Sequence, residues 1–161
     1  MSDPTRLLVW VLLLVPLHAV TASPPDSVDV RLDAHRWEHR LLFVFASSAS
    51  DARLARQREA LREHATGFRD RDLLLITLMG DGENGTLQSG PGEETRPLTT
   101  AAVRRLYDRF SVGPEEFRVV LVGKDGTEKR RDPEPVTARS LFDTIDAMPM
   151  RQREMRQNDG P

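Results

Sequence analysis

Three serines and an aspartate follow an apolar stretch, and they are the residues whose types and spacing could carry chemistry. The run Leu41–Ala46 is followed by Ser47, Ser48, Ser50 and Asp51. An apolar run of this length that stops in small hydroxyl residues indicates a buried strand that leads through a short turn into a helix. In α/β sheets, ligands bind at this junction, outside the carboxyl end of the strand.

The residues at this junction support more than one chemical interpretation. A serine nucleophile needs a neighbouring base held by a third group, and nothing in the sequence places a histidine beside Ser47, Ser48 or Ser50. The N-terminus of the following helix could instead bind an anion through its free amides, assisted by Arg53 or Arg56. The simplest interpretation assigns the hydroxyls and Asp51 to capping the helix and closing the turn. The candidate anion site consists of five residues: Ser47, Ser48, Ser50, Asp51 and Arg53.

Two other groups of residues have the types that bind metals, but not the pattern. His35 and His39 could share one face of a helix, yet no third ligand is visible. In a strand their side chains would lie about 13 Å apart. Asp81, Glu83 and Asn84 suggest a calcium loop, but a third oxygen donor is absent where it should precede the glycine. We therefore expect no metal and no cofactor.

Composition excludes several classes of function. The chain has 161 residues, no cysteine and a formal net charge of −2. Without cysteine, its own residues cannot perform thiol redox chemistry or form thiolate metal sites. The near balance of 23 basic and 25 acidic residues also argues against a dedicated nucleic-acid surface.

The N-terminal residues are typical of a secretory signal peptide. Arg6 precedes the apolar run Leu7–Leu17, and the small residues before Ser23 suit a signal peptidase. We expect residues 1–22 to be the signal peptide and residues 23–36 a polar tether. Retention of the segment as a membrane anchor is the alternative, which the short apolar run disfavours. The prediction is a secreted or periplasmic protein that leaves the membrane after cleavage and meets a protein partner in the envelope or the extracellular space.

The remaining elements follow from hydrophobic periodicity and turn residues. Apolar runs predict strands over 41–46, 73–79 and 117–122, and the Asp-Gly turn after the third predicts a hairpin with a polar return strand over 127–131. Apolar residues at helical spacing predict helices that begin near Ser50 or Asp51, at Thr99 or Thr100, and at Thr137. The first should end near Gly67, and Pro149 should end the last. Residues 80–97 are expected to form a flexible loop, Trp37 to lie in the core or at its boundary, and residues 155–161 to form a disordered tail.

This order of elements predicts an α/β fold in a single domain over residues 37–154. The sequence β-α-β-α-β-β-α joins a parallel βαβ unit to an antiparallel ββα unit. A mixed sheet flanked by helices results. This is the order of a thioredoxin-like core, in which the first strand lies centrally.

Three segments carry a resemblance to a known family. They are Trp37–Ala46, Val119–Gly126 and Ile145–Glu154. The chain resembles bacterial members of a thioredoxin-like domain-of-unknown-function family, with relatives among vertebrate sushi-repeat-containing and coiled-coil-domain-containing extracellular matrix proteins. The resemblance implies the fold and export, but no reaction. Lys124 and Asp125 belong to the second segment, and turn formation is their simplest role.

The chain departs from redox members of the thioredoxin superfamily at two places. Ala46–Ser50 stands where a Cys-x-x-Cys motif would lie. A proline immediately before the third strand is also not matched, because Pro114 lies three residues before Phe117. Both departures agree with the absence of thiol chemistry.

The third segment supports two further interpretations. Pro149 could stop a helix without the particular residues that follow it. Arg151 and Glu154 could pin the C-terminus onto the domain by charge-assisted bonds. Alternatively, the segment with Met148 and Met150 could be a docking surface for a partner.

Two functions from different classes remain after the sequence alone. The first is an exported binding module without thiol redox activity, which recognises a protein or an envelope component. The second is an enzyme or enzyme accessory that binds an anionic small molecule at the serine-rich turn. The absent cysteine and the unpaired serines favour the first, non-enzymatic function.

Overall fold

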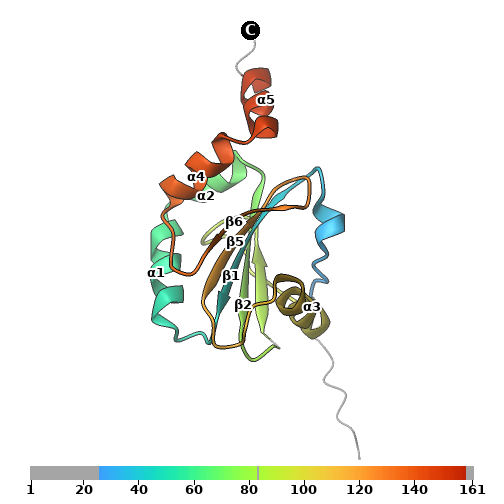
Figure 1. Cartoon of the computed structure of the whole chain (residues 1–161), viewed down its shortest axis with the longest axis vertical. Helices are drawn as coiled ribbons and strands as arrows, with labels where there is room; N and C mark the ends of the chain where they lie inside the picture. Colours follow the sequence, from blue (N-terminus) through green and yellow to red (C-terminus); the bar gives the residue numbers. More distant parts are fainter. Residues whose placement is uncertain (1–25, 83, 159–161) are drawn as a thin grey trace, which may run out of the picture.

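The centre of the fold is a mixed six-stranded sheet. A computed structural model describes residues 26–82 and 84–158, and its strands lie in the order β4-β3-β2-β1-β5-β6 (Figure 1). The central strand β1 (Arg40–Ala46) is buried along its whole length and runs parallel to β2 (Leu73–Met79). Burial on both faces explains why these runs are continuously apolar. The predicted α/β class with a mixed sheet is confirmed, whereas the thioredoxin-like assignment stays a prediction.

The second half of the sheet is antiparallel. Strand β5 (Arg118–Val122) pairs with the free side of β1, and β6 (Glu128–Asp132) returns along β5. The turn between them contains Gly126 at φ +77°, a left-handed conformation that glycine adopts without strain. The predicted hairpin is therefore confirmed. All five residues of β6 are charged, as suits a strand at the edge of a sheet.

Residues 80–97 are not a plain loop, and that prediction was wrong. They contain β3 (Gly85–Gln88), which pairs antiparallel with β2, and the short β4 (Arg96–Pro97). The glycine that opens β3 packs so closely that a Cβ there would lie 2.9 Å from the side chains of Leu98 and Val103. A residue that indicated a loop by its type is therefore required for packing between strand and helix.

Helices cover both faces of the sheet (Figure 1). One face carries α1 (Ala52–Leu61), α2 (Ala65–Arg69) and α4 (Ala138–Asp146). The opposite face carries α3 (Thr100–Phe110) and the chain before β1, which includes the 3-10 helix η1 (Leu32–His35). The N-caps of α1, α3 and α4 are Asp51, Thr99 and Thr137, and the side chain of each accepts a hydrogen bond from a backbone N–H.

The chain before Trp37 packs onto the domain. Val30 is fully buried in the core beneath α3, and Val28 forms a single parallel bridge with Leu98. The structure therefore places part of the expected tether, residues 23–36, within the packed unit. The predicted signal peptide lies outside the described residues.

Two helix boundaries differ from prediction. The expected single helix after Asp51 is divided into α1 and α2, which brings both Leu61 and Phe68 into one core cluster. Pro149 does not end the helical region, because it is the first residue of a new helix, α5 (Pro149–Asn158). Proline is favoured at this first position, where its missing N–H costs no hydrogen bond. Helix α5 extends beyond the end of the sheet (Figure 1).

Candidate functional site

The serine-rich turn is closed by its own aspartate. Ser47 donates a hydrogen bond to Asp51 (3.1 Å), and Asp51 accepts the backbone N–H of Arg53 (2.8 Å) and two bonds from its guanidinium. The side-chain hydrogen bond from Arg53, with its backbone N–H and Ser47, holds the pKa of Asp51 well below its usual range. Ser48 and Ser50 bond to each other at the surface. A resident carboxylate thus occupies the helix N-terminus where an anion would bind.

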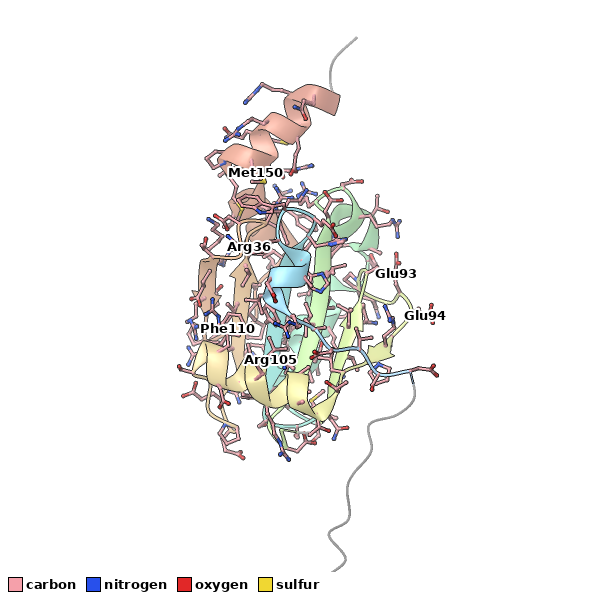
Figure 2. All side chains as sticks on the ribbon, turned by 90° about the vertical axis from the view of Figure 1, so that its right-hand side faces the viewer. Arg36, Glu93, Glu94, Arg105, Phe110 and Met150 are labelled. Atoms are coloured by element: carbon pink, nitrogen blue, oxygen red, sulfur yellow. The ribbon has the colours of Figure 1, made fainter. Side chains whose placement is uncertain are left out.

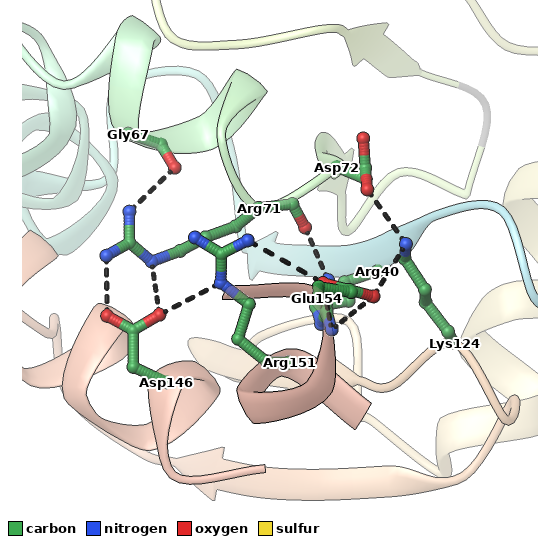
Figure 3. A network of polar contacts seen from close by, with 8 residues as sticks. All are labelled: Arg40, Gly67, Arg71, Asp72, Lys124, Asp146, Arg151 and Glu154. Carbon is green, nitrogen blue, oxygen red and sulfur yellow. Dashed lines mark hydrogen bonds and ion pairs between the residues drawn. The ribbon is translucent and has the colours of Figure 1, made fainter. Parts of the chain in front are cut away.

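The second predicted group is organised around a buried arginine. Arg40, at the start of β1, is only 1% exposed. Its guanidinium donates to the carbonyl of Arg71 (2.8 Å) and to both carboxylate oxygens of Glu154 (3.1 and 3.2 Å), as Figure 3 shows. A buried guanidinium requires such partners, because an unpaired buried charge is strongly destabilising. Glu154 thereby joins the C-terminal helix to the central strand.

Lys124 adds a second cation to the same carboxylate. Its ammonium lies 2.9 Å from Glu154 and 2.8 Å from Asp72, which precedes β2. Burial alone would raise the pKa of Glu154, but the hydrogen bond from Lys124 and the charges of Arg40 and Lys124 outweigh it and lower that pKa. Glu154 is therefore a stable anion between two cations.

A further set of contacts holds the base of α5 (Figure 3). Arg71 donates two hydrogen bonds to the carboxylate of Asp146 (3.0 and 2.6 Å). Its guanidinium lies 4.2 Å from the ring centroid of Phe142. Arg151, which is buried, reaches both Asp146 (3.3 Å) and Glu154 (3.6 Å). We call this group of residues the α5 network: Arg40, Arg71, Asp72, Lys124, Asp146, Arg151 and Glu154. It accounts for the predicted pinning role of Arg151 and Glu154.

An open cavity of about 470 Å³ lies beside the α5 network. Its walls come from the β5–β6 turn and from the junction of α4 and α5, and they include Lys124, Asp125, Met148, Pro149 and Met150. The structure therefore brings together two segments that the sequence singled out separately. We call this feature the α4–α5 cavity.

The family comparison covers the whole of this arrangement. A sequence profile described as domain of unknown function (DUF4174) matches residues 31–154, and so it spans the α5 network from Arg40 to Glu154. The chain belongs to the DUF4174 family. The resemblance stated from the sequence is thus confirmed, and the match ends at the residue that closes the network.

Two curated relatives contain a segment similar to this DUF4174 domain. Coiled-coil domain-containing protein 80 of Danio rerio is 29% identical over 140 residues, covering 81% of this chain and 16% of the relative. Sushi repeat-containing protein SRPX2 of Xenopus laevis is 25% identical over 134 residues, covering 82% of this chain and 28% of the relative. The chain thus spans between about a sixth and just over a quarter of these longer proteins.

An exposed tryptophan lies at the hairpin turn that forms one wall of the DUF4174 cavity. The side chain of Trp37 is 62% exposed, which corrects its predicted place in or beside the core. Its backbone has φ +71°, an uncommon conformation for a bulky residue, and its N–H donates to the carbonyl of Lys124 (2.7 Å). The neighbouring Arg36 packs over Gly126 of the same turn. Arg36 and Met150 lie toward the same end of the molecule in Figure 2.

The sequence missed the partners that complete the α5 network. Arg40, Arg71, Asp72 and Asp146 received no role from the sequence. The one available signal was Arg40, a charge placed directly before a run of buried residues. Such a residue becomes buried with its strand and must find a counter-charge.

Two properties of the described part of the DUF4174 domain bear on its chemistry. Within residues 26–82 and 84–158, no group of three or more histidine, aspartate or glutamate side chains is arranged to hold a metal ion. Over the same residues, no helix has both the length and the apolar character to cross a bilayer.

Proposed function

We propose that this DUF4174 domain is an exported, thioredoxin-like binding module that docks a macromolecular partner at the α4–α5 cavity. It performs no thiol redox chemistry of its own, because the chain contains no cysteine. The observation that carries the proposal is the cavity of about 470 Å³, which combines methionines with basic residues at one end of the fold.

The packing of the two methionines supports this function for Met150 in particular. Met148 packs against the core cluster beneath α1 and α4, so it is partly structural. Met150 is half-buried and lines the cavity without belonging to either core cluster. A flexible thioether at a cavity wall can adapt to a partner's side chain.

The α5 network makes this wall rigid before a partner arrives. Arg151 and Glu154 hold the base of α5 against the domain, and Lys124 holds the hairpin turn on the opposite wall. A preformed wall costs less ordering entropy on binding than a mobile one. These residues therefore position the surface and should not be used as probes of contact, because their replacement would undock α5.

Site-specific cross-linking tests the proposal. A photoreactive residue at Met150 of the full chain should give a reproducible adduct with one macromolecule in the producing cells. The same residue at the exposed Arg58 of α1, away from the cavity, is the matched control. The proposal fails if Met150 and Arg58 give the same adducts, or if Met150 gives none.

Ser47→Ala in the Met150 cross-linking protein separates the binding module from the anion-binding alternative. The recovered partner should be unchanged, because Ser47 bonds only to the capping aspartate within the described residues. Loss of the adduct with this substitution, at unchanged stability, would favour a ligand at the serine-rich turn. The pairing of Asp51 with Arg53 gives that alternative less support.

A further inference from the structure

Basic residues outnumber acidic residues in the lining of the α4–α5 cavity, although the chain as a whole is negatively charged. Four basic residues line it, Arg40, Lys124, Lys129 and Arg153, against the single carboxylate of Asp125. The whole chain has a net charge of −2. Concentration of one sign of charge in a cleft focuses the field there and attracts ligands of the opposite sign.

The four cations differ in their availability to a ligand. Arg40 and Lys124 are committed to Glu154, and Lys129 bonds to Asp125 at 2.6 Å. Arg153 is exposed and forms no ion pair within residues 26–82 and 84–158. The Nε of Arg40 is buried and has no hydrogen-bond partner among the described residues, but Glu154 balances the charge of this guanidinium. Arg153 is thus the cation that can pair directly with a ligand.

Apolar groups complete the surface. Met148, Pro149 and Met150 offer a place for an apolar side chain inside the cavity. At the hairpin wall, the exposed Trp37 is backed by Arg36, whose guanidinium lies 5.6 Å from the ring centroid. Tryptophan and arginine are enriched among the residues that dominate binding energy at protein interfaces.

We propose that the partner docks an acidic polypeptide segment with one apolar anchor, its carboxylates facing Arg153 and its anchor lying against Met150. This inference rests on the docking function proposed above. A dense polyanion, such as a nucleic acid or a sulfated glycan, fits less well. It would meet Asp125 in the wall and gain nothing from the methionines.

Selection from a random peptide library tests the chemistry of the segment. Dodecapeptides displayed on phage are selected against the full chain carrying Trp10→Phe, which leaves Trp37 as the only tryptophan. We expect the enriched peptides to contain about twice the aspartate and glutamate of the starting library, together with an aliphatic or aromatic residue. Synthetic versions should change the emission of Trp37 saturably.

Charge variants test whether binding uses the cavity. Arg153→Glu should weaken binding of a selected peptide about tenfold, because it removes an attraction and adds a repulsion. Arg156→Glu makes the same change one turn further along α5, outside the cavity lining, and should weaken binding less than about twofold. A peptide in which glutamines replace the acidic residues should also lose affinity for the unmodified protein, and Arg153→Glu should weaken its binding less than about twofold because the peptide carries no carboxylate to repel.

The outcomes distinguish this inference from the proposed function. The inference that the partner docks an acidic segment is overturned if the selected peptides show no acidic enrichment. It is also overturned if Arg153→Glu and Arg156→Glu weaken binding equally. If Met150 still cross-links to a macromolecule, docking stands and only the partner's chemistry is wrong. Acidic peptides that bind at Arg153 while Met150 yields no adduct in cells would support the ligand chemistry and refute the docking function. Selection of sulfated glycans over peptides in a competition assay would also overturn the inference.

Discussion

Replacing Glu154 by glutamine should reveal how strongly the α5 network holds the domain together. The substitution removes the anion that faces the buried Arg40 but keeps the shape of the side chain. At the observed 3.1 Å, Coulomb's law with an effective dielectric constant of about 20 gives a gross attraction of about 5 kcal/mol. The cost of dehydrating both ions offsets part of this in the folded protein.

The net loss is set by what remains after the substitution. A buried cation that loses its partner typically costs about 3–5 kcal/mol. Glu154 is 22% exposed, and Arg40 keeps its bond to the carbonyl of Arg71, so both features reduce the penalty. We expect Glu154→Gln to lower the free energy of unfolding by about 2–3 kcal/mol.

Urea denaturation at pH 7, followed by circular dichroism, measures this loss. Glu59→Gln is the matched control, because Glu59 pairs with Arg62 at a similar distance of 3.0 Å while its side chain is 65% exposed. It should cost less than about 0.5 kcal/mol. In an Arg40→Met background the effect of Glu154→Gln should be smaller than in the unmodified protein, because only Lys124 and Arg151 then remain to pair with Glu154. Equal costs for the two glutamate substitutions would refute the reasoning.

Three more predictions concern packing and pH. Gln57→Leu should cost about 2 kcal/mol in the same urea assay, because the buried amide exchanges two hydrogen bonds with the backbone of Val136 (2.8 and 3.0 Å) and both backbone groups would lose their partner. Gly80→Ala should lower the melting temperature far more than Gly113→Ala. A Cβ at residue 80 would lie 1.9 Å from the carbonyl oxygen of Pro114, whereas one at residue 113 would meet nothing closer than 3.5 Å. Similar melting temperatures for the two variants would contradict this prediction. The carboxylates of Glu154 and Asp146 have lowered pKa values in the folded state. Their contribution to the free energy of unfolding is therefore complete above their unfolded pKa values of about 4, and it is lost as pH falls through the folded values. When the free energy of unfolding is measured against pH in acid, the curve for Glu154→Gln should be less steep than that for the unmodified protein.

Local sequence patterns were sufficient for the central strands and the helix starts. The runs 41–46 and 73–79 are apolar at every position or nearly so, and only burial on both faces stabilises such a strand. Thr99 and Thr137 each precede a helical stripe of apolar residues, so their capping roles follow from type and position. Hydrophobic periodicity reports local structure, and the positions of these strands and helix starts follow from such local patterns.

The α5 network could not be predicted because its partners are far apart in the chain. Arg40 and Glu154 are separated by 114 residues. The sequence suggests that Glu154 could pin the C-terminus, but nothing local indicates that Arg40 is its partner. The pairing of Gln57 with Val136 spans 79 residues and leaves no local signal either. β3 was missed for a different reason, since its opening glycine suggests a turn while serving tight packing.

The two borders of the sheet restrict how another polypeptide can attach. β4 has only two residues and includes Pro97. The chain at Val28 lies beside it, donating a backbone hydrogen bond to Pro97 (2.8 Å) and accepting one from Thr99 (3.0 Å). β6 is charged at every position, and its pairing with β5 is interrupted by a register shift at Leu121 and Val122. Strand addition is therefore discouraged at both borders, which protects a disulfide-free protein from growing intermolecular sheets. Under the docking function proposed above, side chains of the α4–α5 cavity would recognise the partner, and specificity would depend on shape and charge and not on main-chain complementarity.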